Sequence, residues 1–349
     1  MLDLALRTLA FAGGLVLIIV TVSAAIRSFV LPRNESVKLN SFVFQPLRLL
    51  FDLAAARQRT FAARDRVQAH YAPVALVTLP VVWLTVVTGG FTLIYWGLGE
   101  GEWLQCYLIS GSSLLTLGTH KASGPAAAVF TFAEATLGLL LLTLLISYLP
   151  TIYQAFSRRE IIVARLELRA GTPPAAATLL TWLSRSGSLL DDTAQWELWE
   201  EWFVEIEESH TSLPILSFFR SPQPGRSWVS TAALILDTAA LMFSAVVTER
   251  DQQAELTFKA GCLSVNRVYR FFNESLRSTP NHVLPDNDLL EEPGRPDFDR
   301  TCESLLEAGL TMHPDRDEAW RQYCELRSRY ATALEFLARL TMAPEAKSV

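Results

Sequence analysis

The chain of 349 residues lacks the motifs of common enzymes and metal-binding modules. Its four cysteines are far apart and form no CxxC pair, so neither a zinc site nor a disulfide framework is predicted. No glycine-rich phosphate loop, EF-hand or HExxH motif occurs either. Because no nucleophile has a credible general base, we predict that the protein is not an enzyme, and we assign no catalytic residue, metal or cofactor.

Charge is scarce in three long stretches of the first half. They lie between Arg7 and Arg27, from Tyr71 to Gly99 without a charge, and from Pro125 to Ser157 with Glu134 as the single charge. A helix that spans a bilayer needs roughly 20 predominantly apolar residues. The sequence therefore predicts an integral membrane protein with three spans.

The second half differs in charge and pattern. Residues 1–157 carry 10 Lys and Arg against 7 Asp and Glu, a net charge of +3, while residues 158–349 carry 20 against 29, a net charge of −9. Such an acidic region is a poor partner for nucleic acid. Its apolar residues recur at helical spacing with no alternating strand pattern, which predicts an all-α cytoplasmic domain. We expect the apolar run 228–247, with Asp237 at its centre, to be a core helix of that domain.

Basic residues predict the orientation of the spans, because Lys and Arg concentrate in cytoplasmic loops. The linker 32–71 is strongly basic and Arg158 and Arg159 follow the third run, whereas residues 99–124 contain only Lys121. We expect a multi-pass plasma-membrane protein with the N-terminus outside and the C-terminus in the cytoplasm. A signal peptide cleaved near residues 23–25 would put the basic linker outside, contrary to the same rule.

The linker 32–71 also carries apolar residues at helical spacing. A helix there either lies flat among the lipid headgroups or packs on cytoplasmic protein, and the sequence leaves both alternatives open.

A short segment between the second and third runs is unusual for a membrane protein. Residues 102–115 predict a helix too short to span, and residues 116–120, Thr-Leu-Gly-Thr-His, predict a loop that returns to the same face. Non-helical backbone at membrane depth is tolerated where protein buries it or where it lines a water-filled path.

Two stretches resemble potassium-channel-type proteins. Thr116-Leu117-Gly118 resembles the Thr-Val-Gly start of the potassium-channel filter, and residues 147–160, SYLPTIYQAFSRRE, resemble the inner-helix end of bacterial two-transmembrane channel-like proteins. The resemblance implies a homotetramer in which filter carbonyls bind permeant monovalent cations, K⁺ above all. It predicts a pore domain at 72–157 (span, pore helix and filter 102–120, inner span), between an N-terminal membrane helix 1–31 with the linker 32–71 and the cytoplasmic all-α domain 158–349.

The end of the filter departs from the family pattern. Thr119 stands where the family has Tyr, His120 where it has a second Gly, and Lys121 where it has Asp. Because glycine tolerates backbone angles that other residues avoid, the outer ion sites are not carried over and we expect only weak potassium selectivity. Histidine titrates near neutral pH, so acid pH is expected to reduce conductance through His120.

Further candidates surround this segment. Glu134 is a carboxylate within a span, which either supports the filter or pairs with a hydroxyl to hold the packing. Glu100 and Glu102 either form an acidic ring at the outer mouth or stabilise the start of the short helix. Gly138 and Pro150 provide a gate hinge or a static bend in the third span.

We therefore expect a tetrameric, weakly selective cation channel in the lipid bilayer. The alternative is a channel-like membrane protein that does not conduct and acts as a sensor or scaffold through its helical domain. Neither the gating stimulus nor a ligand of that domain follows from the sequence.

Overall fold

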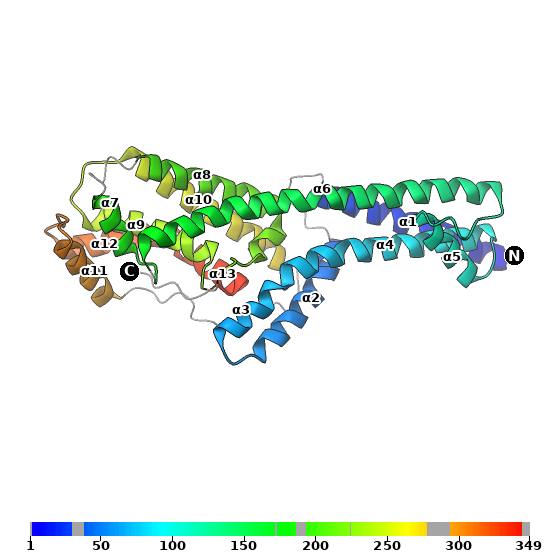
Figure 1. Cartoon of the computed structure of the whole chain (residues 1–349), viewed down its shortest axis with the longest axis horizontal. Coiled ribbons are helices and arrows are strands. Elements are labelled where there is room, and N and C mark those ends of the chain that lie inside the picture. The colour runs from blue at the N-terminus through cyan, green and yellow to red at the C-terminus, as the bar shows by residue number, and fades with distance from the viewer. Residues whose placement is uncertain are drawn as a thin grey trace. The chain divides into compact units, whose positions relative to one another are not determined.

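The computed structural model describes residues 2–29, 38–171, 173–185, 193–223, 225–277 and 294–343. Within these ranges the regular structure is helical, apart from one isolated bridge between Val246 and Met312, so the predicted all-α class is confirmed. The chain divides into two compact units, residues 1–153 and 154–349 (Figure 1). The predicted boundary between the N-terminal helix and the basic linker, at residues 31 and 32, lies outside the described residues.

The first unit consists of five helices and the beginning of a sixth. These are α1 (Leu2–Phe29), α2 (Lys38–Ala56), α3 (Phe61–Ala69), α4 (Tyr71–Leu98), α5 (Trp103–Leu114) and the first part of α6 (Pro125–Ala170).

Helices α1 and α4 pack closely and antiparallel (Figure 1). A Cβ atom on Gly14 would lie 2.4 Å from the Gly90 carbonyl oxygen, and one on Gly97 would lie 2.8 Å from the Arg7 carbonyl oxygen. Small residues of this kind let helix backbones approach each other in membranes. Because the start of α1 meets the end of α4, the N-terminal end of α1 and helix α5 lie at the same end of this unit.

Helices α2 and α3 form a hairpin at the other end of α4. The Gln68 amide donates a hydrogen bond to Asp52 (2.9 Å), and the Tyr71 hydroxyl donates to the Phe44 carbonyl oxygen (3.4 Å). One face of α2 contacts α3 and α4, while the opposite face exposes three leucines, Leu49, Leu50 and Leu53.

The second unit contains the last part of α6 and the rest of the helices. These are α7 (Ala176–Arg185), α8 (Thr193–Ser212), the 3₁₀ turn η1 (Pro214–Phe218), α9 (Trp228–Ala245), α10 (Gln252–Arg277), α11 (Arg295–Glu307), α12 (Arg316–Ser328) and α13 (Ala331–Thr341). The tryptophans of α8 and most of α9 form its buried core.

Four helices of the described chain are long and apolar enough to cross a membrane: α1, the α3–α4 segment, α6 and α9. This supports a multi-pass membrane protein. Helix α9 differs from the others because almost all of its side chains are buried within the second unit. Its Asp237 accepts a hydrogen bond from the Tyr330 hydroxyl (2.5 Å) and lies 3.7 Å from Arg327.

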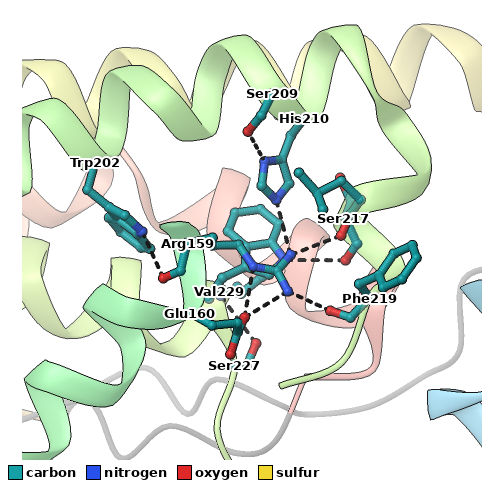
Figure 2. A network of polar contacts seen from close by, with 11 residues as sticks. Arg159, Glu160, Trp202, Ser209, His210, Ser217, Phe219, Ser227 and Val229 are labelled. Atoms are coloured by element: carbon teal, nitrogen blue, oxygen red, sulfur yellow. Dashed lines mark hydrogen bonds and ion pairs between the residues drawn. The ribbon is translucent and has the colours of Figure 1, made fainter. Parts of the chain in front are cut away.

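A buried arginine fixes the end of α6 within the second unit (Figure 2). Arg159 donates to the carbonyl oxygens of Leu216 (2.9 Å) and Phe219 (2.7 Å) and pairs with Glu160 (2.8 Å). One guanidinium nitrogen also lies 3.4 Å from Nε2 of the buried His210. Since guanidinium only donates, this nitrogen of His210 must be the acceptor, and burial together with the charge of Arg159 lowers the His210 pKa well below 6.5.

Candidate functional site

The candidate site is helix α5 with the loop that follows it. At 1.5 Å per residue, the 12 residues of α5 cover about 18 Å, less than the ~30 Å hydrocarbon core of a bilayer. Residues 115–124 then lead back to the start of α6, at the same end of the unit where α4 finishes (Figure 1). Helix and loop therefore begin and end at the same end of the first unit (Figure 1).

The amide groups of the loop bond back to the last turn of α5. The N–H groups of Leu117 and Gly118 donate to the Ser112 carbonyl oxygen (2.8 and 3.4 Å), and the N–H of His120 donates to Ser112 Oγ (3.0 Å). The Thr119 hydroxyl also lies 3.3 Å from Ser112 Oγ. The buried Ser112 thus holds most of the predicted filter, residues 116–120, through backbone and side chain together.

The carbonyl oxygens of residues 115–121 behave differently. None of them accepts a hydrogen bond from a residue that the structure describes. In a trans peptide group the N–H and C=O bonds point in opposite directions. Because the N–H groups of Leu117, Gly118 and His120 point at Ser112, the carbonyls of Thr116, Leu117 and Thr119 point away from it. The loop therefore directs carbonyl oxygens that no described residue bonds to the side opposite α5.

Left-handed backbone angles alternate along this loop. Thr116 has φ +56° and Gly118 has φ +68°. Glycine adopts such an angle freely, whereas a β-branched threonine is strained there by about 1–3 kcal/mol. The three hydrogen bonds to Ser112 stabilise the loop against that strain.

Glu134 joins three helices behind the loop. Its carboxylate accepts hydrogen bonds from the Tyr95 hydroxyl (2.8 Å) and from Ser110 Oγ (2.5 Å), so it connects α6 to α4 and to α5. The side chain is fully buried. These contacts are the ones expected if Glu134 pairs with hydroxyl groups and holds the helices together. Glu134 forms no hydrogen bond with the described residues 116–120, so any effect on them passes through α5.

The two predicted mouth carboxylates differ in their surroundings. Glu100 accepts hydrogen bonds from the N–H groups of Ser123 (2.6 Å) and Gly124 (2.9 Å), which anchors the end of the loop at the start of α6. Glu102 occupies the N-cap position of α5, makes no side-chain capping bond and is exposed. Glu102 is thus the more accessible of the pair.

Gly138 and Pro150 both lie inside α6. A Cβ atom on Gly138 would lie 2.2 Å from the Leu114 carbonyl oxygen, so this glycine lets α6 approach the end of α5. Helix α6 continues through Pro150 without a break, from Pro125 to Ala170. The contact gives Gly138 a packing role in addition to the predicted hinge.

Sequence reasoning did not single out Ser112, Ser110 or Tyr95. A usable signal was present, because Ser110, Ser112 and Ser113 concentrate hydroxyl groups at the end of a short helix in an otherwise apolar region. Glu134, the shared partner of Ser110 and Tyr95, lies 24 and 39 residues from them, and only the folded chain reveals these contacts.

The loop and the helix before it are poorly covered within one chain. Leu115 and Leu117 of the loop are exposed, and so are Trp103, Leu104 and Tyr107 of α5. Large exposed apolar surface on a protein marks contact with lipid or with another protein.

Comparison of the chain with protein-family models, curated proteins and solved structures finds no match, so its function is inferred from this geometry.

Proposed function

We propose that the first unit forms the pore of a cation channel assembled from four copies of the chain. The observation that carries the proposal is the loop in which the amides of Leu117, Gly118 and His120 bond to Ser112 while the carbonyls stay unbonded. A row of such oxygens can replace the hydration shell of a cation.

In this proposal α1, α4 and α6 span the bilayer with the N-terminus and the loop outside. The antiparallel packing of α1 on α4 supports that orientation, since it puts the start of α1 beside the α4–α5 connection. Helix α9 stays in the cytoplasm as a core helix, because its apolar side chains are already covered by protein. Cysteine labelling in intact cells should then reach residues 99–103 and not residues 52–66.

The fourfold assembly follows from what one chain leaves incomplete. A single loop offers oxygens from one side only, whereas a dehydrated cation needs them all round. The exposed leucines at 115 and 117 provide apolar surface for neighbouring copies or lipid. Closed rotational symmetry brings identical loops to one axis.

We expect potassium to be preferred only weakly. Thr119 and His120 replace the aromatic residue and glycine of potassium filters, and their polar groups contact each other (3.2 Å) and Ser112. With fewer consecutive carbonyl rings, rejection of sodium should be weaker.

The test is a recording from purified protein in planar bilayers with opposed potassium and sodium solutions. A reversal potential between zero and the potassium equilibrium value is expected. A reversal near the chloride value would exclude a cation channel. Absence of current from verified tetramers would favour the alternative, a non-conducting scaffold, and a dimer or monomer at all concentrations would count against the filter.

A further inference from the structure

A small pocket lies where η1 and the start of α9 meet α13 in the second unit. It is lined by Ser217, Phe219, Arg220, Ser221, Arg226, Ser227, Trp228 and Thr341. The pocket is partly open, and its inner space of about 10 Å³ admits one group the size of a water molecule. No acidic residue belongs to this described lining.

Two serine hydroxyls in this pocket lack partners. Ser217 is 1% exposed and Ser221 is 9% exposed, and the Oγ atom of each has no hydrogen-bond partner among the described residues. A buried hydroxyl without a partner is costly, so a native protein is expected to supply one. Both hydroxyls can donate, which favours a ligand with acceptor oxygens.

Two arginines line the same pocket. Arg220 is held there by a hydrogen bond from Nη1 to the Met342 carbonyl oxygen (2.7 Å), and Arg226 forms an ion pair with Glu167. The pocket also lies at the N-terminus of the 18-residue helix α9, whose N-cap is Ser227. Helix N-termini favour anions through their N–H groups and dipole.

We propose that this pocket binds a phosphate group. One phosphate oxygen enters between Ser217 and Ser221 and accepts both hydroxyl protons. The remaining oxygens lie at the mouth against Arg220 and Arg226, since the inner space admits only one oxygen. Inorganic phosphate, a soluble phosphate monoester and a lipid headgroup share this chemistry. The inference concerns the second unit and is independent of the pore.

The experiment uses the full chain in nanodiscs of zwitterionic lipid. Thermal unfolding is followed in chloride, sulfate and phosphate at equal ionic strength, and the phosphate dissociation constant is measured by calorimetry. Phosphate should raise the Tm of the wild-type chain above its value in chloride, because a ligand that binds only the folded state stabilises it. Glycerol phosphate in solution and phosphatidic acid in the nanodisc then distinguish soluble from lipid sources.

The proposal predicts that some substitutions weaken phosphate binding and that one strengthens it. The double variant Ser217→Ala/Ser221→Ala should lose the phosphate shift and be at least as stable as wild type in chloride, because two unpartnered hydroxyls are removed. Arg220→Gln should weaken phosphate binding about tenfold or more. Glu167→Gln should strengthen it, since Arg226 loses its competing carboxylate. Arg250→Gln, at an exposed ion pair with Glu255, is the matched control and should change nothing.

Two results would overturn the proposal. One is an equal Tm in phosphate and chloride for wild type and for Glu167→Gln, which means that no phosphate binds. The other is a double variant less stable than wild type by the same amount in both salts, which means that an ordered water alone fills the pocket.

Discussion

Helices α6 and α9 are alike in sequence and opposite in surroundings. Both contain an apolar stretch long enough to span a membrane, and in that stretch a single acidic side chain accepts a hydrogen bond from a tyrosine hydroxyl, Glu134 from Tyr95 in α6 and Asp237 from Tyr330 in α9. Yet 17% of the apolar window of α6 is buried within the chain, against 89% for α9. Apolar composition therefore does not decide whether lipid or protein covers a helix.

The difference implies two ways of stabilising the molecule. The second unit covers its own apolar side chains, so its stability should respond to changes in its interior. The first unit leaves much apolar surface for lipid or further copies, so its exposed residues should matter for assembly instead. Substitutions in matched pairs, one residue in each kind of surrounding, test this contrast.

The largest effect is expected from a polar residue in α9. Leu236→Gln places an amide in the fully buried core and should destabilise the second unit by about 3–5 kcal/mol, through lost apolar burial and an unsatisfied polar group. Phe132→Gln in α6 changes an exposed side chain and should leave folding intact while weakening assembly. Denaturant unfolding and native mass measurements test both, and equal unfolding effects would contradict the contrast.

Two neighbouring arginines provide the next test. Arg159→Gln removes the buried cation that binds Leu216, Phe219 and Glu160, and it should cost about 3–5 kcal/mol. Arg158→Gln removes an exposed ion pair with Glu205 and should cost at most about 1 kcal/mol. Similar losses for the two variants would show that Arg159 does not hold the end of α6.

In the first unit the strongest packing effect is expected at Gly138. Gly138→Ala forces α6 away from the Leu114 carbonyl oxygen, should cost about 1–3 kcal/mol and should displace the loop. Gly89→Ala is the control, because the added Cβ would meet no described atom within 4 Å beyond its neighbours and the backbone of its own helix. Current recordings and thermal unfolding separate the two, and normal current from Gly138→Ala would show that the contact is dispensable.

Ser112→Ala should act on the loop more than on the fold. It removes the Oγ acceptor of the His120 amide but keeps the carbonyl acceptor, a loss of about 1 kcal/mol. The ratio of potassium to sodium permeability should fall. Ser113→Ala removes a hydroxyl that donates to the Ile109 carbonyl oxygen and bonds none of residues 116–120, and it should leave that ratio unchanged.

A gradual effect, spread over a pH range, is the pH dependence contributed by His210. Its lowered folded-state pKa means that the unfolded chain binds a proton first as pH falls below 6.5. Stability from this group is therefore complete above 6.5 and declines by up to about 1.4 kcal/mol per pH unit below it. Unfolding curves between pH 7.5 and 5.5 check this, and His210→Gln should flatten the slope. An unchanged slope would show that His210 is not the titrating group.

The sequence alone determined the helical class, the apolar segments and the position of a short helix followed by a loop. These properties are local, because they depend on composition and on periodicity within one segment. Periodicity alone does not show where one helix ends and the next begins. Apolar residues recur at helical spacing through 315–341, but the chain turns between α12 and α13, where the Tyr330 hydroxyl reaches Asp237, 93 residues away.

Which polar groups meet depends on how distant segments of the chain pack together. Glu134 was a candidate from its charge, but its partners Tyr95 and Ser110 lie on other helices. The attachment of residues 117–120 to Ser112, the pairing of Arg159 with His210 and the unpartnered hydroxyls of Ser217 and Ser221 appear only when distant segments are brought together. A hydrogen bond requires a specific distance and direction, and residue spacing along the chain contains neither.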